Sequence, residues 1–309
     1  MTIVVGYAPD GRGRGVLHLA AMLARSAGEE IVVCAVVPEP WPPSPARIDA
    51  EYQAYLVRGA EEALERARAR LPADLPVSTV VRHARSAPRG LLDAAEQYDA
   101  AMIVTGSSAA GGAGHVSVGS TTARLLHSSE FPVALPPPGF RRRPDARVER
   151  VTVAYGGSDG AEELLTAAAG VTARVGATLR LASFAVHARP PYTAGVGRQG
   201  DEEMIAEWRE EIEASASAVL EKIGRMPEQP RALDAVVGRG ESWEEALEDV
   251  DWEEGDVLVV GSSSIGPVAR VFLGSRATKI VRYSPVPVIA VPRAVAAELA
   301  EEAAAGAAG

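Results

Sequence analysis

The sequence GSSAAGGAGHVSVGS (106–120) returns in altered form as GSSSIGPVARVFLGS (261–275), 155 residues further along the chain. Both segments begin with glycine, end in Gly-Ser and follow a short apolar run. The stretches FPVALP and VPVIAVP, which come after them, keep the same offset. Self-similarity at a fixed offset is the mark of a repeated unit. The chain of 309 residues therefore holds two copies of one domain, in keeping with a length above that of most single domains.

Each copy alternates short β-branched runs with longer helical segments, a pattern that predicts parallel strands joined by crossover helices. The run IVVCAVV (31–37) is apolar throughout, as expected for a strand covered by helices on both faces. Its cysteine, Cys34, is expected to be a small buried hydrophobe. Strands are predicted near 2–7, 31–37, 77–82, 101–105 and 132–136 in the first copy, and near 151–155, 178–186, 232–237, 256–260 and 286–291 in the second.

The repeat divides the chain into four parts. We place the first domain at 1–137, a linker rich in proline and arginine at 138–150, the second domain at 151–293 and a tail rich in alanine and glutamate at 294–309. The linker is expected to be solvated, with a nucleic-acid-binding arm as the less favoured alternative. The composition of the tail indicates a frayed helix or a disordered segment.

Composition excludes several classes of protein. The net charge of -10 and the pI near 5.2 argue against broad binding to nucleic acid, which needs a basic face. A single cysteine allows no disulfide framework within the chain. The chain opens without the pattern of a signal peptide, and no apolar run reaches about 18 residues, so we expect a cytoplasmic protein that does not bind membranes.

In each copy, the glycine segment joins an apolar strand to a helical pattern that begins around Gly119-Ser120 or Gly274-Ser275. Backbone N–H groups in such a loop can point at an anion, and the helix N-terminus adds about half a positive charge. Glycine lets a phosphate approach the main chain closely, and serine can donate a hydrogen bond. The pattern predicts a phosphate-binding loop, with the alternative that Ser120 and Ser275 only cap their helices.

The spacing of the glycine segment, together with the F/V-P-V strand after its helix, resembles the universal stress protein family, and the duplication resembles its tandem members. The resemblance covers 2–292 apart from the linker. It implies an α/β fold with two doubly wound domains, each a five-stranded parallel sheet of order 3-2-1-4-5 flanked by helices. It also implies that the two fifth strands pair, making an intramolecular pseudo-dimer; a homodimer of the chain stays open.

The resemblance further implies a stress-response regulatory protein that binds ATP, or another adenine nucleotide, with Mg²⁺ at the carboxyl edge of each sheet. The implied binding residues are Gly106, Ala109, Gly119, Ser120 and Val36 in the first domain, and Gly261, Ser264, Gly274, Ser275 and Phe184 in the second. Val36 and Phe184 would contact the base, although their side chains suit a plain core equally well. The second domain is expected to be the better site, because its segment holds fewer glycines and loses less entropy on ordering.

The chain departs from the family pattern at two places in each copy. Ala109 and Ser264 replace the second glycine of the loop, and Ala8 and Gly156 replace the aspartate that commonly follows the first strand. A protein of the same fold that binds no nucleotide and acts as an interaction module is therefore the alternative.

Catalytic interpretations have weaker support. No G-x4-G-K-(S/T) occurs, which excludes a P-loop NTPase. The stretch YGGSDGAEELL (155–165) matches the S-G-G-x-D-S motif of ATP-pyrophosphatases only in part, and a helix cap explains Asp159 or Ser158 as well. No metal-ligand spacing and no grouping of serine, histidine and carboxylate is recognisable. We therefore expect no metal site, no dedicated catalyst and at most slow ATP hydrolysis.

Overall fold

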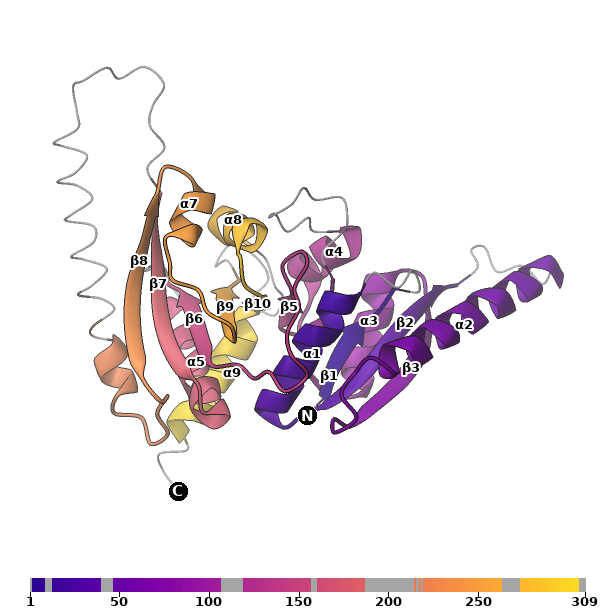
Figure 1. The fold of residues 1–309 in the computed structure, drawn as a ribbon, viewed down its shortest axis with the longest axis horizontal. Helices are drawn as coiled ribbons and strands as arrows, with labels where there is room; N and C mark the ends of the chain where they lie inside the picture. Colours follow the sequence, from indigo (N-terminus) through magenta and orange to yellow (C-terminus); the bar gives the residue numbers. More distant parts are fainter. Residues whose placement is uncertain are drawn as a thin grey trace, which may run out of the picture.

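The fold is an α/β arrangement built on one long sheet (Figure 1). The computed structural model describes residues 2–8, 13–39, 47–106, 119–156, 160–186, 214, 217, 219–262 and 273–305. Its first half contributes β1 (Thr2–Gly6), β2 (Glu30–Pro38), β3 (Val77–Ala84), β4 (Ala100–Val104) and β5 (Val133–Leu135). Its second half contributes β6 (Arg150–Ala154), β7 (Thr178–Val186), β8 (Leu233–Gly240), β9 (Asp256–Gly261) and β10 (Val288–Val291). These strands lie close to the ranges predicted from the sequence.

The two halves repeat one topology. The strand order across the sheet is β3-β2-β1-β4-β5-β10-β9-β6-β7-β8, so each half has the order 3-2-1-4-5. Within each half, neighbouring strands pair in parallel. Crossover helices are needed to join parallel strands, which is why helices follow the strands in turn. The predicted fold class, two doubly wound units in one chain, is confirmed.

Helices cover both faces of the sheet. One face packs against α1 (Arg14–Ala27), α2 (Arg47–Arg68), α5 (Ala161–Val175) and α9 (Arg293–Ala305), and the other against α3 (Ala87–Gln97), α4 (Ser120–Ser128), α7 (Trp243–Glu248) and α8 (Ser275–Tyr283). Along β1, Ile3 and Val5 enter the first core and Val4 enters the second. Because side chains alternate along a strand, a strand buried on both faces must be apolar at every position.

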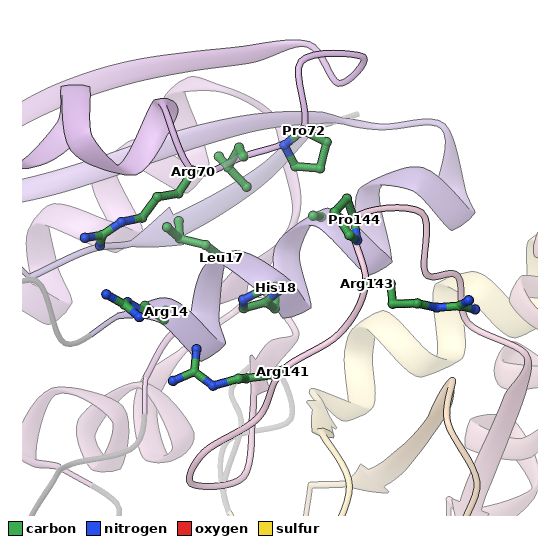
Figure 2. A pocket seen from close by; sticks show the side chains of 10 residues that line it. Arg14, Leu17, His18, Arg70, Pro72, Arg141, Arg143 and Pro144 are labelled. Atoms are coloured by element: carbon green, nitrogen blue, oxygen red, sulfur yellow. The ribbon is translucent and has the colours of Figure 1, made fainter.

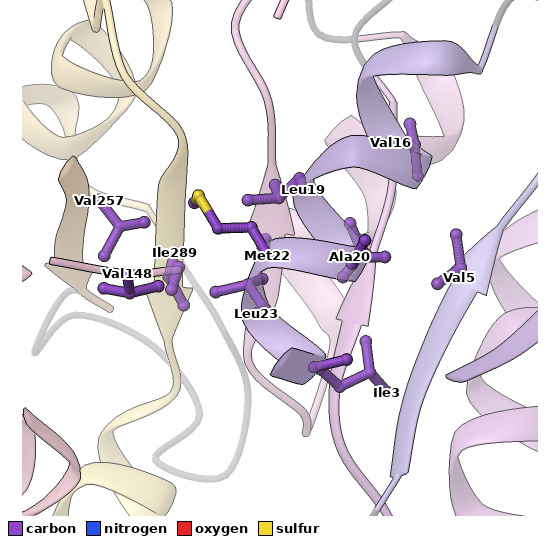
Figure 3. Packing of buried hydrophobic residues seen from close by; sticks show 14 of the residues in the cluster. Ile3, Val5, Val16, Leu19, Ala20, Met22, Leu23, Val148, Val257 and Ile289 are labelled. Carbon is purple, nitrogen blue, oxygen red and sulfur yellow. The ribbon is translucent and has the colours of Figure 1, made fainter. Parts of the chain in front are cut away.

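The fifth strands of the two halves join the sheet in the middle. β5 and β10 pair antiparallel, with Val288 opposite Leu135 and Ala290 opposite Val133. This confirms the predicted pairing of the two units within the chain. Beside this junction, Figure 3 shows Met22 and Leu23 of α1 facing Ile289 of β10, and all three belong to one continuous core. The two halves therefore share buried apolar surface as well as a sheet.

The linker between the halves is largely exposed, as expected of a solvated segment, but two of its side chains anchor it to the core. Phe140 and Val148 are buried, at 5% and 7% exposure. The backbone N–H of Val148 donates to the Ser26 hydroxyl at 2.7 Å, and Arg147 donates to the carbonyl of Arg25 at 2.6 Å. Phe140 lies beside Gly15 at the start of α1 and Val148 beside Ser26 at its end. The two side chains therefore fix the linker along α1, because their burial removes apolar surface from water.

The alanine-rich tail is a docked helix over the residues described. Figure 1 shows α9 alongside α5, and the two helices are in contact. Gly170 of α5 permits the approach, since a Cβ at that position would lie 2.7 Å from the Cβ of Ala303. Ala296 is 2% exposed in the same contact region of the core. Small residues on both helices therefore allow close packing, which the alanine-rich composition of the tail did not by itself predict.

Candidate functional site

The candidate residues of the first half meet where β4 ends at the carboxyl edge of the sheet. Gly106 comes two residues after β4, and α4 begins at Ser120. The hydroxyl of Thr122 donates to the carbonyl of Gly106 at 2.7 Å, and it lies 3.1 Å from the hydroxyl of Thr105. Both threonines are buried. This contact holds Gly106 against the first turn of α4 and so brings together the two ends of the first glycine segment.

Glycine, not serine, occupies the N-cap of the two helices that follow the glycine segments. Gly119 caps α4 with φ -63° and ψ 161°, and Gly274 caps α8 with φ -65° and ψ 169°. Ser120 and Ser275 are the first residues of their helices, and both are exposed. The alternative that these serines cap their helices is therefore wrong.

Neither glycine cap provides a side-chain acceptor for the amides of the first turn. The contrast with two neighbouring helices is direct: Ser86 accepts from Arg89 N at the start of α3, and Ser242 accepts from Glu245 N at the start of α7. The first amides of a helix have no partner within it. At α4 and α8 these donors lie at the carboxyl edge of the sheet, and the residue at the N-cap has no side chain to accept from them.

The second half has different contacts at the corresponding place. Gly261 ends β9, and the next residue, Ser262, donates its N–H to Val291 O at 3.0 Å and accepts from Arg293 N at 2.9 Å. The position that corresponds to Thr122 is Ala277, which has no hydroxyl. The threonine contact that holds the loop of the first half therefore has no counterpart in the second.

A cation lies at the start of α8. A guanidinium nitrogen of Arg276 is 3.8 Å from the place that a Cβ on Gly156 would take, and Gly156 follows β6. The side chain of Arg276 is thus directed across the carboxyl edge of the sheet, while the residue itself is exposed. In this half, the positive end of a helix and an arginine act on the same region, which favours a bound anion.

The two residues expected beside the base are half-buried. Val36 packs over Gly90 of α3, where an added Cβ would lie 2.7 Å from both Val36 methyl groups. Phe184 lies 6.5 Å from Trp243, measured between ring centroids, and Lys279 Nζ lies 5.8 Å from the centroid of Trp243. Neither Trp243 nor Lys279 was predicted from the sequence, since they stand on two different helices and meet only in the fold.

Three residues that the sequence singled out cannot be placed in this site. Ala109, Ser264 and Asp159 lie outside the described residues. Over the part of the chain that the structure describes, no group of three or more His, Cys, Asp or Glu side chains is placed to hold a metal ion. Nor does any helix in that part have the length and apolar character needed to cross a bilayer.

Comparison with known proteins agrees with this architecture. The model of the Universal stress protein family matches twice, at residues 1–136 and 147–292. Universal stress protein Rv2319c of Mycobacterium tuberculosis is 38% identical over 298 residues, which cover 94% of this chain and 100% of that protein. A solved universal stress protein from Archaeoglobus fulgidus DSM 4304 is 21% identical, covers 94% of this chain and 98% of its own, and has a TM-score of 0.57.

A further solved structure, of the universal stress protein from Archaeoglobus fulgidus in complex with dAMP, is 23% identical and has a TM-score of 0.26. It covers 34% of this chain and 80% of its own. Because the family model matches both halves and the mycobacterial relative spans nearly the whole sequence, the chain belongs to the universal stress protein family, with two of the family's domains in one polypeptide.

Proposed function

We propose that this protein is a stress-response regulator that binds an adenine nucleotide at the carboxyl edge of each half-sheet. ATP with Mg²⁺ is the favoured ligand. The observation that carries the proposal is the pair of helices, α4 and α8, whose N-cap is a glycine that offers no side-chain acceptor to their first amides. In open parallel α/β sheets, ligands bind outside the carboxyl ends of the strands. Phosphate groups bind well at helix N-termini, where free N–H groups and the helix dipole point at them.

The phosphates would bind to main-chain amides at the start of α4 and α8. Gly119 and Gly274 have extended backbones that any residue can adopt, so the fold does not require glycine there for its φ angle. Glycine at these caps would instead let a phosphate approach the main chain closely. Arg276 would add a charge-assisted hydrogen bond in the second half, which supports the expectation that this half holds the nucleotide more tightly.

The base would lie against the apolar ends of β2 and β7. In the second half, Phe184 and Trp243 offer aromatic surface, and Lys279 adds a cation beside it. In the first half, Val36 offers only an aliphatic contact. Aromatic side chains stack on planar groups with a gain beyond simple burial. The second half would therefore contact a purine ring more favourably than the first half.

Mg²⁺ would arrive with the nucleotide. It is commonly bound through substrate phosphates and waters with one or two carboxylates, so a dedicated cage is not needed. We assign no catalytic residue, and regulation would follow from occupancy of the two sites rather than from turnover.

Isothermal titration calorimetry with MgATP tests the proposal. The unaltered protein is expected to bind two equivalents, and Gly119→Val or Gly274→Val is expected to remove one equivalent each while the thermal unfolding midpoint stays within a few degrees. Gly59→Val is the matched control, because a Cβ at Gly59 meets nothing within 4 Å. No heat at millimolar MgATP, or two equivalents in both glycine variants, would overturn the nucleotide site and favour the interaction module.

A further inference from the structure

A cavity of about 430 Å³ lies on the face of α1 that the linker covers (Figure 2). Its floor is apolar, with Leu17 of α1 and Leu71 just beyond α2. Its volume is in the range of small-molecule sites in proteins. The three walls come from segments far apart in the sequence: the first turns of α1, the end of α2 and the linker.

The polar groups of this cavity are cationic. Arg14 and His18 come from α1, Arg70 follows α2, and Arg141 and Arg143 belong to the linker. None of the described residues that line the cavity is acidic. Among the residues that the structure describes, neither Arg14 nor Arg141 makes an ion pair, whereas Arg143 has a distant carboxylate partner, Asp145, at 3.8 Å. Positive groups that share a cavity without a counter-ion repel one another, so a bound anion would relieve an existing electrostatic cost.

The guanidinium groups are not scattered around the rim. Figure 2 shows those of Arg14, Arg70 and Arg141 at the same end of the cavity, with His18 beside them, while Arg143 points to the opposite end. Arg70 is held in place by a hydrogen bond to the Tyr7 hydroxyl at 3.2 Å. Guanidinium groups match phosphate oxygens in pairs, so three of them at one end suit a ligand with several such oxygens.

His18 reports the electrostatics of the cavity. Burial lowers its pKa, a hydrogen bond with the backbone of Arg142 raises it, and the charges of Arg141 and Arg14 lower it further. The charged groups that face it are Arg14 on its own helix, Arg70 beyond α2, and the linker arginines. An anion bound among these groups would stabilise the imidazolium.

We propose that this cavity binds a small polyvalent anion that carries phosphate groups. Its described lining comes from α1, the residues after α2 and the linker, and includes none of the described ends of the glycine segments, Gly106, Gly119, Gly261 and Gly274. It also does not depend on nucleotide binding at the sheet edge. The three guanidinium groups bind the anion, the apolar floor carries the remainder of the ligand, and His18 gains a proton when the anion is present.

Inorganic pyrophosphate is a suitable probe, because it has two linked phosphates and no base. Calorimetry at low ionic strength is expected to give a saturable site that persists in the double variant Gly119→Val/Gly274→Val, in which the phosphate sites proposed at the sheet edge are removed. The double variant Arg14→Gln/Arg141→Gln is expected to weaken binding at least tenfold, while Arg143→Gln, whose guanidinium points away, changes it less than twofold. Both variants alter exposed side chains, so folding is checked by circular dichroism.

The pKa of His18, followed by NMR, gives an independent readout. Pyrophosphate is expected to raise this pKa in the unaltered protein and to leave it unchanged in the double variant. By linkage, pyrophosphate then binds more tightly as pH falls through the range in which His18 gains its proton. Gly119→Val and Gly274→Val separate the two proposals. If these variants abolish pyrophosphate binding, the pyrophosphate binds at the sheet edge and the cavity site is overturned. The cavity site is also overturned if Arg14→Gln/Arg141→Gln binds pyrophosphate as tightly as the unaltered protein does.

Discussion

Cys34 shows how the fold decides the chemistry of a single residue. It lies within β2, is 1% exposed and belongs to the core beneath α3. Burial raises the pKa of its thiol to about 12, with a smaller opposing effect from the charge of Arg82. A thiol reacts as the thiolate, so this cysteine is inert in the folded protein. Its environment agrees with the expectation of a small buried hydrophobe.

The buried thiol makes stability depend on alkaline pH. In the unfolded chain the thiol ionises above its ordinary pKa of 9.0, while the folded protein keeps it protonated until about 12. Its contribution to stability is therefore complete below pH 9 and is lost as pH rises toward 12. Relative to Cys34→Ala, the free energy of unfolding should fall by about 1.4 kcal/mol between pH 8 and pH 10.

Urea unfolding of both proteins at the two pH values measures this change. The alanine variant serves as the matched reference, because all other titrating groups are common to both proteins. A difference between the two proteins that stays constant with pH would show that the thiol is accessible and ionises normally in the folded state. Reaction of the native protein with a thiol reagent at pH 8 would show the same.

At the scale of elements, three strands of the second half are tied by a buried ionic cluster. Asp256 of β9 is 1% exposed and accepts from Arg150 of β6 at 2.8 and 2.7 Å. Arg180 of β7 is 3% exposed; it lies 3.5 Å from the same carboxylate and donates to Thr152 at 3.1 Å. Its guanidinium also lies 4.8 Å from the ring of Trp252. The hydrogen bond with Asp256 raises the pKa of Arg150, whereas burial lowers that of Arg180.

Removal of the carboxylate is expected to be costly, because Arg180 would remain buried without its counter-charge. Asp256→Ala should lower the free energy of unfolding by about 3–5 kcal/mol. The control is Asp93→Ala, which removes a partly exposed pair with Arg89 at 2.7 Å on α3, and it should cost less than about 0.5 kcal/mol. Urea unfolding measures both. Equal losses in the two variants would mean that the cluster adds nothing beyond a surface pair.

At the scale of the whole molecule, the two halves form one structural unit. Their sheets join through β5 and β10, and the buried core runs from α1 across Ile289 into the second half. The linker adds Val148 to the same core. Because the halves share both backbone pairing and buried surface, they should unfold together.

A charge at the junction is expected to uncouple the halves. Ile289 is 9% exposed and faces α1 (Figure 3). Ile289→Asp places an unpaired carboxylate there, which costs several kcal/mol. Differential scanning calorimetry should show one transition for the unaltered protein and two for this variant. Tyr55→Asp, at an exposed position of α2, should leave one transition. Two transitions in the unaltered protein, or one in Ile289→Asp, would contradict a shared core.

Much of the fold was predictable because its signals are local. Apolar runs predicted the strands, and the repeated glycine segments predicted the duplication. The strand order and the pairing of the fifth strands were predicted from the family resemblance. The candidate site was predictable only in part. The glycines at its edge are visible in the sequence, whereas Thr122, Arg276, Trp243 and Lys279 act through partners that other elements bring to them.

The sequence by itself determined the two α/β units, their strands and the position of each glycine segment, since periodicity and glycine content act over short stretches of chain. Only the tertiary structure decided that Gly119 and Gly274, rather than the serines after them, cap the helices. It also decided that two linker side chains and the described part of the tail pack against the core, and that arginines from α1, the segment after α2 and the linker line one cavity. Contacts between distant segments depend on packing and on the path of the chain, which no local pattern encodes.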